Sequence, residues 1–105
     1  MDKILLCCGA GMSSSLLVQK MQAEAAARGL DVSISALPLN EAAENLSGVR
    51  VVLLGPQIGY GAGDLRSAIA DMGLEIPVEV IPMLDYGRMN AAGVLDLACG
   101  LGHLA

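Results

Sequence analysis

A cysteine between an apolar run and a glycine-rich loop is the residue of this sequence best placed for chemistry. Residues 4–8 (ILLCC) are continuously apolar and too few for a helix, so they predict a buried β-strand that ends at Cys8. Residues 9–11 (GAG) contain two glycines, which adopt positive φ angles without steric cost. Three serines at 13–15 then stand where a helix N-cap is expected. The sequence therefore places a thiol at the entrance of a loop that leads into a helix N-terminus.

This succession of strand, loop and helix predicts an anion-binding site, because backbone N–H groups and the positive end of the helix dipole converge there. Amides from about Gly11 onward, with the serine hydroxyls, are suited to hold the oxygens of a phosphoryl group. The same helix terminus stabilises a thiolate, so we expect Cys8 to be a catalytic nucleophile. The expected phosphate-binding residues are Gly9, Ala10, Gly11, Met12, Ser13, Ser14 and Ser15.

The order of predicted elements indicates an α/β fold with a single four-stranded parallel sheet. Strands are expected at residues 3–8, 31–36, 49–54 and 78–81. Helices are expected at about 13–28, 60–72 and 88–103, with a short helical turn at 40–46 and a tight turn at 85–87. Right-handed crossovers then put helices on both faces of a sheet with strand order 2-1-3-4, and a phosphatase-like phosphate loop follows the first strand.

Three loops of this fold are expected to meet at one rim, because ligands of such sheets bind beyond the carboxyl ends of the strands at the switch point. Cys8 ends the first strand, Pro56 and Gln57 follow the third, and Tyr86 follows the fourth. Pro56, Gln57 and Tyr86 are therefore possible rim residues. The Gln57 amide either contacts the phosphoryl group or caps its own loop. For Tyr86 we favour packing against the rim over lining it.

Composition limits the class of protein. With 105 residues, of which 54% are hydrophobic, the chain is expected to form one domain, residues 1–105, around an aliphatic core. The net charge of −5 and the six scattered Lys and Arg residues argue against nucleic-acid binding. The three cysteines and one histidine lack metal-ligand spacing, so neither a metal nor a cofactor is expected. No apolar run approaches about 18 residues, and the N-terminus leads directly into the first strand, so we expect a cytoplasmic chain without membrane insertion.

Two phosphoryl chemistries suit a cysteine in this position. The low-molecular-weight tyrosine phosphatases resemble this chain in ending their first strand at the nucleophilic cysteine. Such enzymes need an arginine six residues after the cysteine, where this chain has Ser14, and an Asp-Pro acid motif that is missing here. Hydrolysis is therefore the weaker hypothesis. In the stronger one, Cys8 keeps the phosphoryl group until a specific acceptor arrives. A redox or purely structural role would need a reactive Cys8 without an anion site, for which the loop gives no reason.

Three segments of the chain resemble the IIB components of the bacterial sugar phosphotransferase system, in the lactose, cellobiose and N,N′-diacetylchitobiose class. They are residues 8–17 (CGAGMSSSLL), residues 52–58 (VLLGPQI), and residues 77–81 (PVEVI) with the Tyr86-Gly87 pair. The resemblance implies a phosphocysteine carrier with two partners. A IIA protein would pass a phosphoryl group from its phosphohistidine to Cys8, and Cys8 would pass it to a sugar, by implication a disaccharide, carried by the membrane IIC transporter.

Other reactive side chains are expected to be structural. Cys7 should face the core, and Cys99 should pack among leucines of the last helix. His103 lies three residues from the end of the sequence and is not expected to carry phosphate or metal. Exposed side chains of Met12 and Leu16 would suit a modest, partly apolar surface for a IIA protein beside Cys8.

Overall fold

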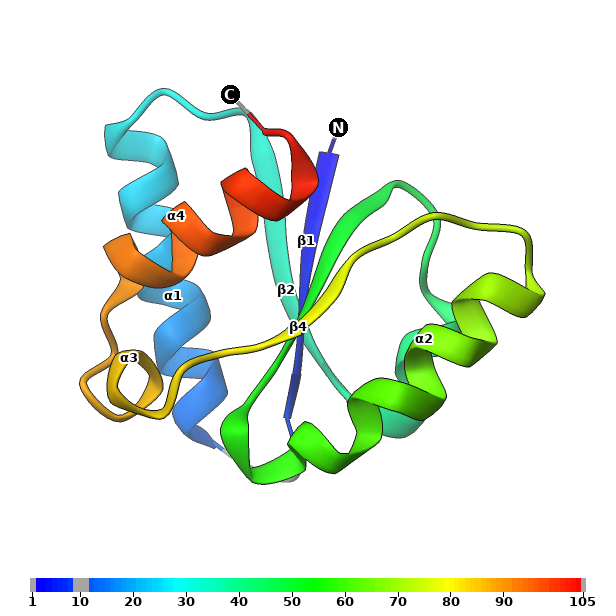
Figure 1. The fold of residues 1–105 in the computed structure, drawn as a ribbon. Coiled ribbons are helices and arrows are strands. Elements are labelled where there is room, and N and C mark those ends of the chain that lie inside the picture. The colour runs from blue at the N-terminus through cyan, green and yellow to red at the C-terminus, as the bar shows by residue number, and fades with distance from the viewer. Residues whose placement is uncertain (1, 9–11, 105) are drawn as a thin grey trace.

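The computed structural model describes residues 2–8 and 12–104 (Figure 1). In chain order the elements are β1 (Asp2–Cys8), α1 (Met12–Ala27), β2 (Val32–Pro38), the 3₁₀ helix η1 (Leu39–Glu44), β3 (Val49–Leu54), the 3₁₀ helix η2 (Pro56–Gly61), α2 (Ala62–Asp71), β4 (Val78–Val80), α3 (Met83–Gly87) and α4 (Ala91–Gly102). The four strands form one parallel sheet in the order β2-β1-β3-β4, which confirms the predicted fold class and strand order.

Helices cover both faces of this sheet, and each face has its own apolar core (Figure 1). Helices α1 and α4 pack on one face, where the buried residues are Ile4, Leu6, Leu17, Val18, Met21, Ala25, Ile34, Val51, Leu53, Ile81, Val94, Leu95, Ala98 and Leu104. Helix α2 with η1 and η2 packs on the other face, where the buried residues are Leu5, Cys7, Ala42, Leu46, Val49, Val52, Leu54, Ile58, Ala62, Leu65, Ile69 and Val78. Since β1 and β3 are covered on both sides, their central residues 4–8 and 51–54 are continuously apolar rather than alternating.

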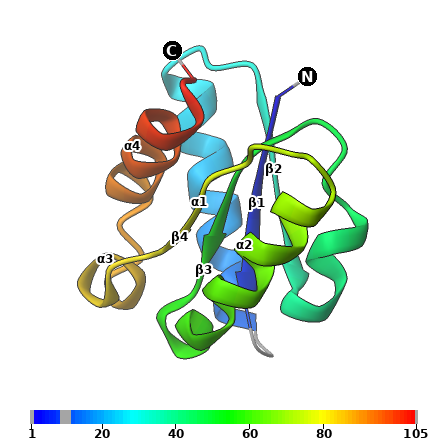
Figure 2. The same cartoon turned by 45° about the vertical axis from the view of Figure 1, so that its right-hand side comes forward.

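Helix α1 ends where the sequence predicts, because Gly29 adopts a φ of +71° just after its last turn. The adjacent Arg28 then ties α1 to α4. Its Nε donates to Glu24 at 2.8 Å, its Nη1 to Asp96 at 2.6 Å and its Nη2 to the carbonyl oxygen of Ala92 at 3.3 Å. These contacts and the shared apolar core hold the two helices of this face together. Figure 2 shows α1 and α4 side by side.

Four predictions about the helices and turns are wrong. The expected tight turn at 85–87 lies within helix α3. The expected last helix, at 88–103, is shortened to α4. It begins only after Asn90, because Met89 takes a positive φ of 50° and the Asn90 side chain caps α4 by accepting from the Gly93 N–H. The expected helix at 60–72 begins as the separate 3₁₀ helix η2. Helix α1 begins at Met12, so the serines at 13–15 belong to its first turn and are not its N-cap.

The outer edge of β4 is covered by side chains. The Pro77 carbonyl accepts from Val52 and the Ile81 N–H donates to Leu54, so alternate residues face β3 while Val78 and Val80 turn their backbone groups outward. Arg66 donates from Nη2 to the Val78 oxygen at 2.6 Å, and the Glu79 carboxylate accepts from the Val80 N–H at 3.2 Å. A parallel strand added at this edge would bond to the Val78 oxygen and the Val80 N–H, and both groups already have hydrogen-bond partners.

Replacing Arg66 with Met keeps the aliphatic part of the side chain but exposes the Val78 oxygen, so we expect more self-association than in the wild type. Light scattering over a concentration series measures it. Arg88→Met, which removes the same charge from an exposed position outside the sheet, is the matched control and should behave as the wild type does. Equal self-association of the two variants would show that charge, and not the exposed strand edge, is responsible.

Candidate functional site

Cys8 is the last residue of β1 and faces helix α1. Side chains alternate along a strand, and Ile4 and Leu6 pack on the face covered by α1, so Cys8 continues that series. Cys7 lies on the opposite face, 1% exposed and within the core beneath α2. The Cys8 side chain is half-buried at the end of the strand. The face and the exposure of Cys8 therefore suit a reactive thiol, and those of Cys7 do not.

The N-terminus of α1 lies within short reach of this thiol. Helix α1 begins at Met12, and four peptide steps of about 3.6 Å separate Met12 from Cys8 by at most about 14 Å. The first N–H groups of a helix have no acceptor within it and carry the positive end of its dipole. The expected ligands Gly9, Ala10 and Gly11 lie outside the described residues, and Met12, Ser13 and Ser14 are described only as helical backbone. The exposed Ser15 completes the first turn.

Two residues of the predicted rim, Gln57 after β3 and Tyr86 after β4, lie close to Gly55. The Gly55 N–H donates to the Cys7 carbonyl oxygen at 2.9 Å, which continues the pairing of β3 with β1. A Cβ at this glycine would lie 3.0 Å from Gln57 Oε1 and 3.4 Å from Tyr86 Cε2. The Gln57 side chain is exposed, and Tyr86 is half-buried against the core beneath α1 and α4. Pro56 begins η2 and is half-buried.

Sequence reasoning missed two features of this edge. It gave Gly55 no role at the rim. It also missed exposed apolar side chains on the elements that follow β3 and β4, namely Tyr60 (81% exposed) in η2 and Met83 (75%) and Leu84 (68%) in α3, which join the expected Leu16 (44%) in α1. The adjacent Met83 and Leu84 after Pro82 were the available signal. All four side chains belong to elements that begin at the carboxyl edge of the sheet, at the lower end of Figure 1.

The other two cysteines are poor nucleophiles. Burial, and then the neighbouring Cys8, raise the pKa of the Cys7 thiol to about 11. Burial also raises the pKa of the Cys99 thiol, against the opposing effect of the Arg28 charge. Cys99 is half-buried against the core, as expected for a packing residue, and His103 is exposed just after α4. Within residues 2–8 and 12–104, no cluster of His, Cys, Asp and Glu could hold a metal ion.

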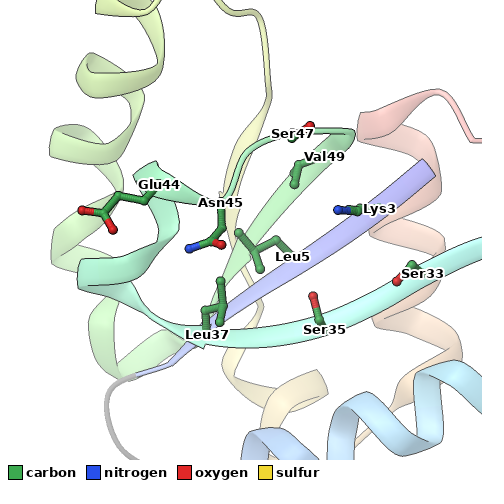
Figure 3. A pocket seen from close by; sticks show the side chains of 9 residues that line it. All are labelled: Lys3, Leu5, Ser33, Ser35, Leu37, Glu44, Asn45, Ser47 and Val49. Carbon is green, nitrogen blue, oxygen red and sulfur yellow. The ribbon is translucent and has the colours of Figure 1, made fainter. Parts of the chain in front are cut away.

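A hollow of about 340 Å³ lies elsewhere, between β1, β2 and the segment that follows η1 (Figure 3). It is lined by Lys3, Leu5, Ser33, Ser35, Leu37, Glu44, Asn45, Ser47 and Val49. Leu5 shares its sheet face with Cys7, so this hollow opens on the face opposite to the Cys8 side chain. It contains none of the rim residues and is not part of the candidate site.

In the described part of the chain, no helix is both long and apolar enough to cross a bilayer.

Comparison with known proteins identifies the family. Residues 3–97 match the family model of the lactose/cellobiose-specific IIB subunit of the PTS, the sugar phosphotransferase system. The chain belongs to this family. It is 41% identical over 103 residues to the galactose-specific EIIB component of Lactococcus lactis, covering 92% of this chain and 94% of that one. It is 39% identical over 101 residues to the oligo-beta-mannoside-specific EIIB component of Bacillus subtilis, covering 96% of both chains.

Solved structures of IIB proteins have the same fold. The cellobiose-specific IIB protein of Borrelia burgdorferi superposes with a TM-score of 0.78 at 36% identity, covering 97% of this chain and 92% of that one. The lactose-specific IIB domain of Streptococcus pneumoniae superposes with a TM-score of 0.76 at 13% identity, covering 92% and 96%, which supports the fold alone. The chain is thus a IIB component of a lactose/cellobiose-type sugar phosphotransferase, and the resemblance noted in its sequence is confirmed.

The thiols of this IIB chain should differ sharply in reactivity. With a pKa of about 11, only about one Cys7 thiol in ten thousand is ionised at pH 7, and burial blocks its access. We therefore expect iodoacetamide to modify Cys8 well before Cys7 or Cys99, and sulfate to slow only the modification of Cys8. Peptide mass spectrometry over time measures all three. Modification of Cys7 at the rate of Cys8, or a Cys8 rate indifferent to sulfate, would contradict this assignment.

Proposed function

We propose that this IIB chain is a phosphocysteine carrier that receives a phosphoryl group on Cys8 from the phosphohistidine of a IIA protein and delivers it to a sugar at a membrane IIC transporter. The observation that supports this most is the position of Cys8, which ends β1 on the face covered by α1 and precedes the first turn of that helix by four residues. The proposed site consists of Cys8 as nucleophile and residues 9–15 as phosphate ligands. Residues 1–105 form the proposed IIB domain.

Both transfers are in-line displacements at phosphorus. In the first, the Cys8 thiolate attacks, the S–P bond forms, and the P–N bond breaks with its electron pair passing to the imidazole of the IIA protein. In the second, a sugar hydroxyl oxygen forms a bond to phosphorus, the S–P bond breaks with its electron pair returning to the Cys8 sulfur, and the hydroxyl proton passes to the released thiolate. Amides at the N-terminus of α1 stabilise the equatorial oxygens in each step, so positioning and electrostatics supply the catalysis.

A carrier must not lose its phosphoryl group to water, and the sequence of the loop suits that requirement. Ser14 occupies the position of the arginine that clamps phosphate in the cysteine phosphatases. The Asp-Pro acid that protonates their leaving group is also missing from this sequence. Without this cation and this acid, attack by water gains little from the site, whereas a docked partner brings its own acceptor group.

The exposed apolar side chains of Leu16, Tyr60, Met83 and Leu84 support a docking role for the carboxyl edge of the sheet. A transient complex needs only a small, partly apolar contact around the transferred group. We propose that the IIA protein and the IIC transporter use this edge in turn. For the sugar, the named substrates of the relatives (galactose, cellobiose and oligo-β-mannoside) support a disaccharide or related sugar of the lactose/cellobiose type.

Incubation with phosphoenolpyruvate, enzyme I, the histidine carrier protein and a cognate IIA protein should add one phosphoryl mass to the wild type. Cys8→Ser should gain none, because a serine hydroxyl is too weakly acidic to supply a nucleophile at neutral pH. Cys7→Ser and Cys99→Ser are the matched controls and should gain the same mass as the wild type. Intact-protein mass spectrometry decides. Labelling of Cys8→Ser at the wild-type rate would refute the carrier proposal.

Phosphatase activity offers a separate test. Since Ser14 replaces the clamping arginine, turnover of para-nitrophenyl phosphate by the wild type should be indistinguishable from that in buffer alone. Release of para-nitrophenol, followed by absorbance, measures it, with Cys8→Ser as the blank. Robust turnover that is lost in Cys8→Ser would instead favour a hydrolase.

A further inference from the structure

Gly55 directly follows β3 and lies next to Cys8 at the end of the neighbouring strand β1. Cys7 pairs with Leu54 in the parallel register, and the Gly55 N–H donates to the Cys7 oxygen at 2.9 Å. Continuing this register puts Gly55 opposite Cys8, on a strand about 4.8 Å away. Leu54 packs in the core on the same face as Cys7, so position 55 and Cys8 both face the opposite side. A side chain at position 55 would therefore occupy the space next to the Cys8 sulfur.

The backbone does not explain why this position is a glycine. Gly55 has φ −61° and ψ 147°, an extended conformation that any L-residue adopts without strain. Its surroundings do explain it. A Cβ here would lie 3.0 Å from Gln57 Oε1 and 3.4 Å from Tyr86 Cε2, and only 3.7 Å from the Cys7 carbonyl oxygen. The glycine thus leaves a space beside Cys8, and the Gln57 amide and the Tyr86 ring enter it.

The two side chains in this space differ in character. Gln57 is exposed and ends in an uncharged amide with two N–H donors. Tyr86 is half-buried, belongs to α3, and packs against the core beneath α1 and α4, so its ring forms a fixed wall on the Cys8 side of the sheet. Through its N–H donors, the Gln57 amide can hydrogen-bond a phosphoryl oxygen on Cys8 without adding the positive charge that a phosphatase uses.

We propose that Gly55 is a positioning residue, which leaves room for the Gln57 amide to contact the phosphoryl group carried by Cys8. This inference rests on the carrier function proposed above and extends it, because it assigns a phosphate ligand outside the loop and helix of residues 9–15. The Gln57 amide supplements the amides of α1 from the opposite side of the thiol. It holds the phosphoryl group in line for transfer, and the Tyr86 ring borders the same space.

The experiment compares Gly55→Ala, Gln57→Leu and the double variant in rapid-quench transfer from a phosphorylated IIA protein to the full chain. Each single variant should lower the maximal transfer rate about tenfold or more, the effect of losing one hydrogen bond to a charged group. The IIA concentration that gives half the maximal transfer rate should change little, because the proposed docking surface is intact. The double variant should be no slower than Gly55→Ala alone, since both changes remove the same contact.

Gly63→Ala is the matched control, because Gly63 is exposed on α2 and a Cβ there meets no atom within 4 Å. It should transfer at the wild-type rate. If Gly55→Ala fails to fold, as thermal unfolding would show, Gln57→Leu decides alone, since the Gln57 side chain is exposed. Suppose that the wild type is phosphorylated on Cys8. Transfer by Gln57→Leu at the wild-type rate, or additive rate losses in the double variant, would then overturn this inference and leave the carrier function standing. A wild type that is not labelled on Cys8 would overturn it together with the carrier function.

Discussion

The pairing of β1 with β2 on one side and β3 on the other is the constraint on which the rest of the structure depends. Because both faces of β1 are covered, every residue from Ile4 to Cys7 is buried, and Cys8 is the residue at the carboxyl end of the strand that reaches the surface. The thiol that we propose to be reactive therefore lies at the end of a strand that is paired on both sides. Its sequence neighbour Cys7, which has the same chemical group, is kept inert by burial and a raised pKa.

Parallel pairing also brings the other site elements to the same edge. Each strand delivers its carboxyl end there, so η2 and α3 begin beside the end of β1 although they lie about 50 to 80 residues away in the chain. Gly55 leaves space between these elements, and a side chain in its place would meet Gln57 and Tyr86. At the far edge of the sheet, Arg66 and Glu79 bond the outward backbone groups of β4. The β4 edge is thus covered, whereas exposed apolar side chains lie on the elements that begin at the carboxyl edge, where we propose that partners dock.

The sequence was sufficient for the fold class and the face of Cys7, because apolar runs and the Gly and Pro residues that end them are local signals. The strand order was expected from the general rules for parallel α/β sheets. The sequence was insufficient where local signals conflict with packing. The serines at 13–15 looked like an N-cap, but the helix already begins at Met12. The predicted turn around Tyr86 is helical, and the break falls instead at Met89, whose positive φ no residue-type preference would suggest. Gly55 was missed because its role depends on side chains that meet it only in three dimensions.

The central claim is that a phosphoryl group on Cys8 is held by the first turn of α1, and nuclear magnetic resonance of the phosphorylated chain tests it most directly. The account predicts a phosphorus resonance typical of an S-phosphate. It also predicts that the amide resonances that shift most on phosphorylation belong to the loop after Cys8 and to residues 12–15, while those of β4 stay in place. A phosphorus resonance typical of phosphoserine or phosphohistidine, or first-turn amides that do not respond, would contradict it.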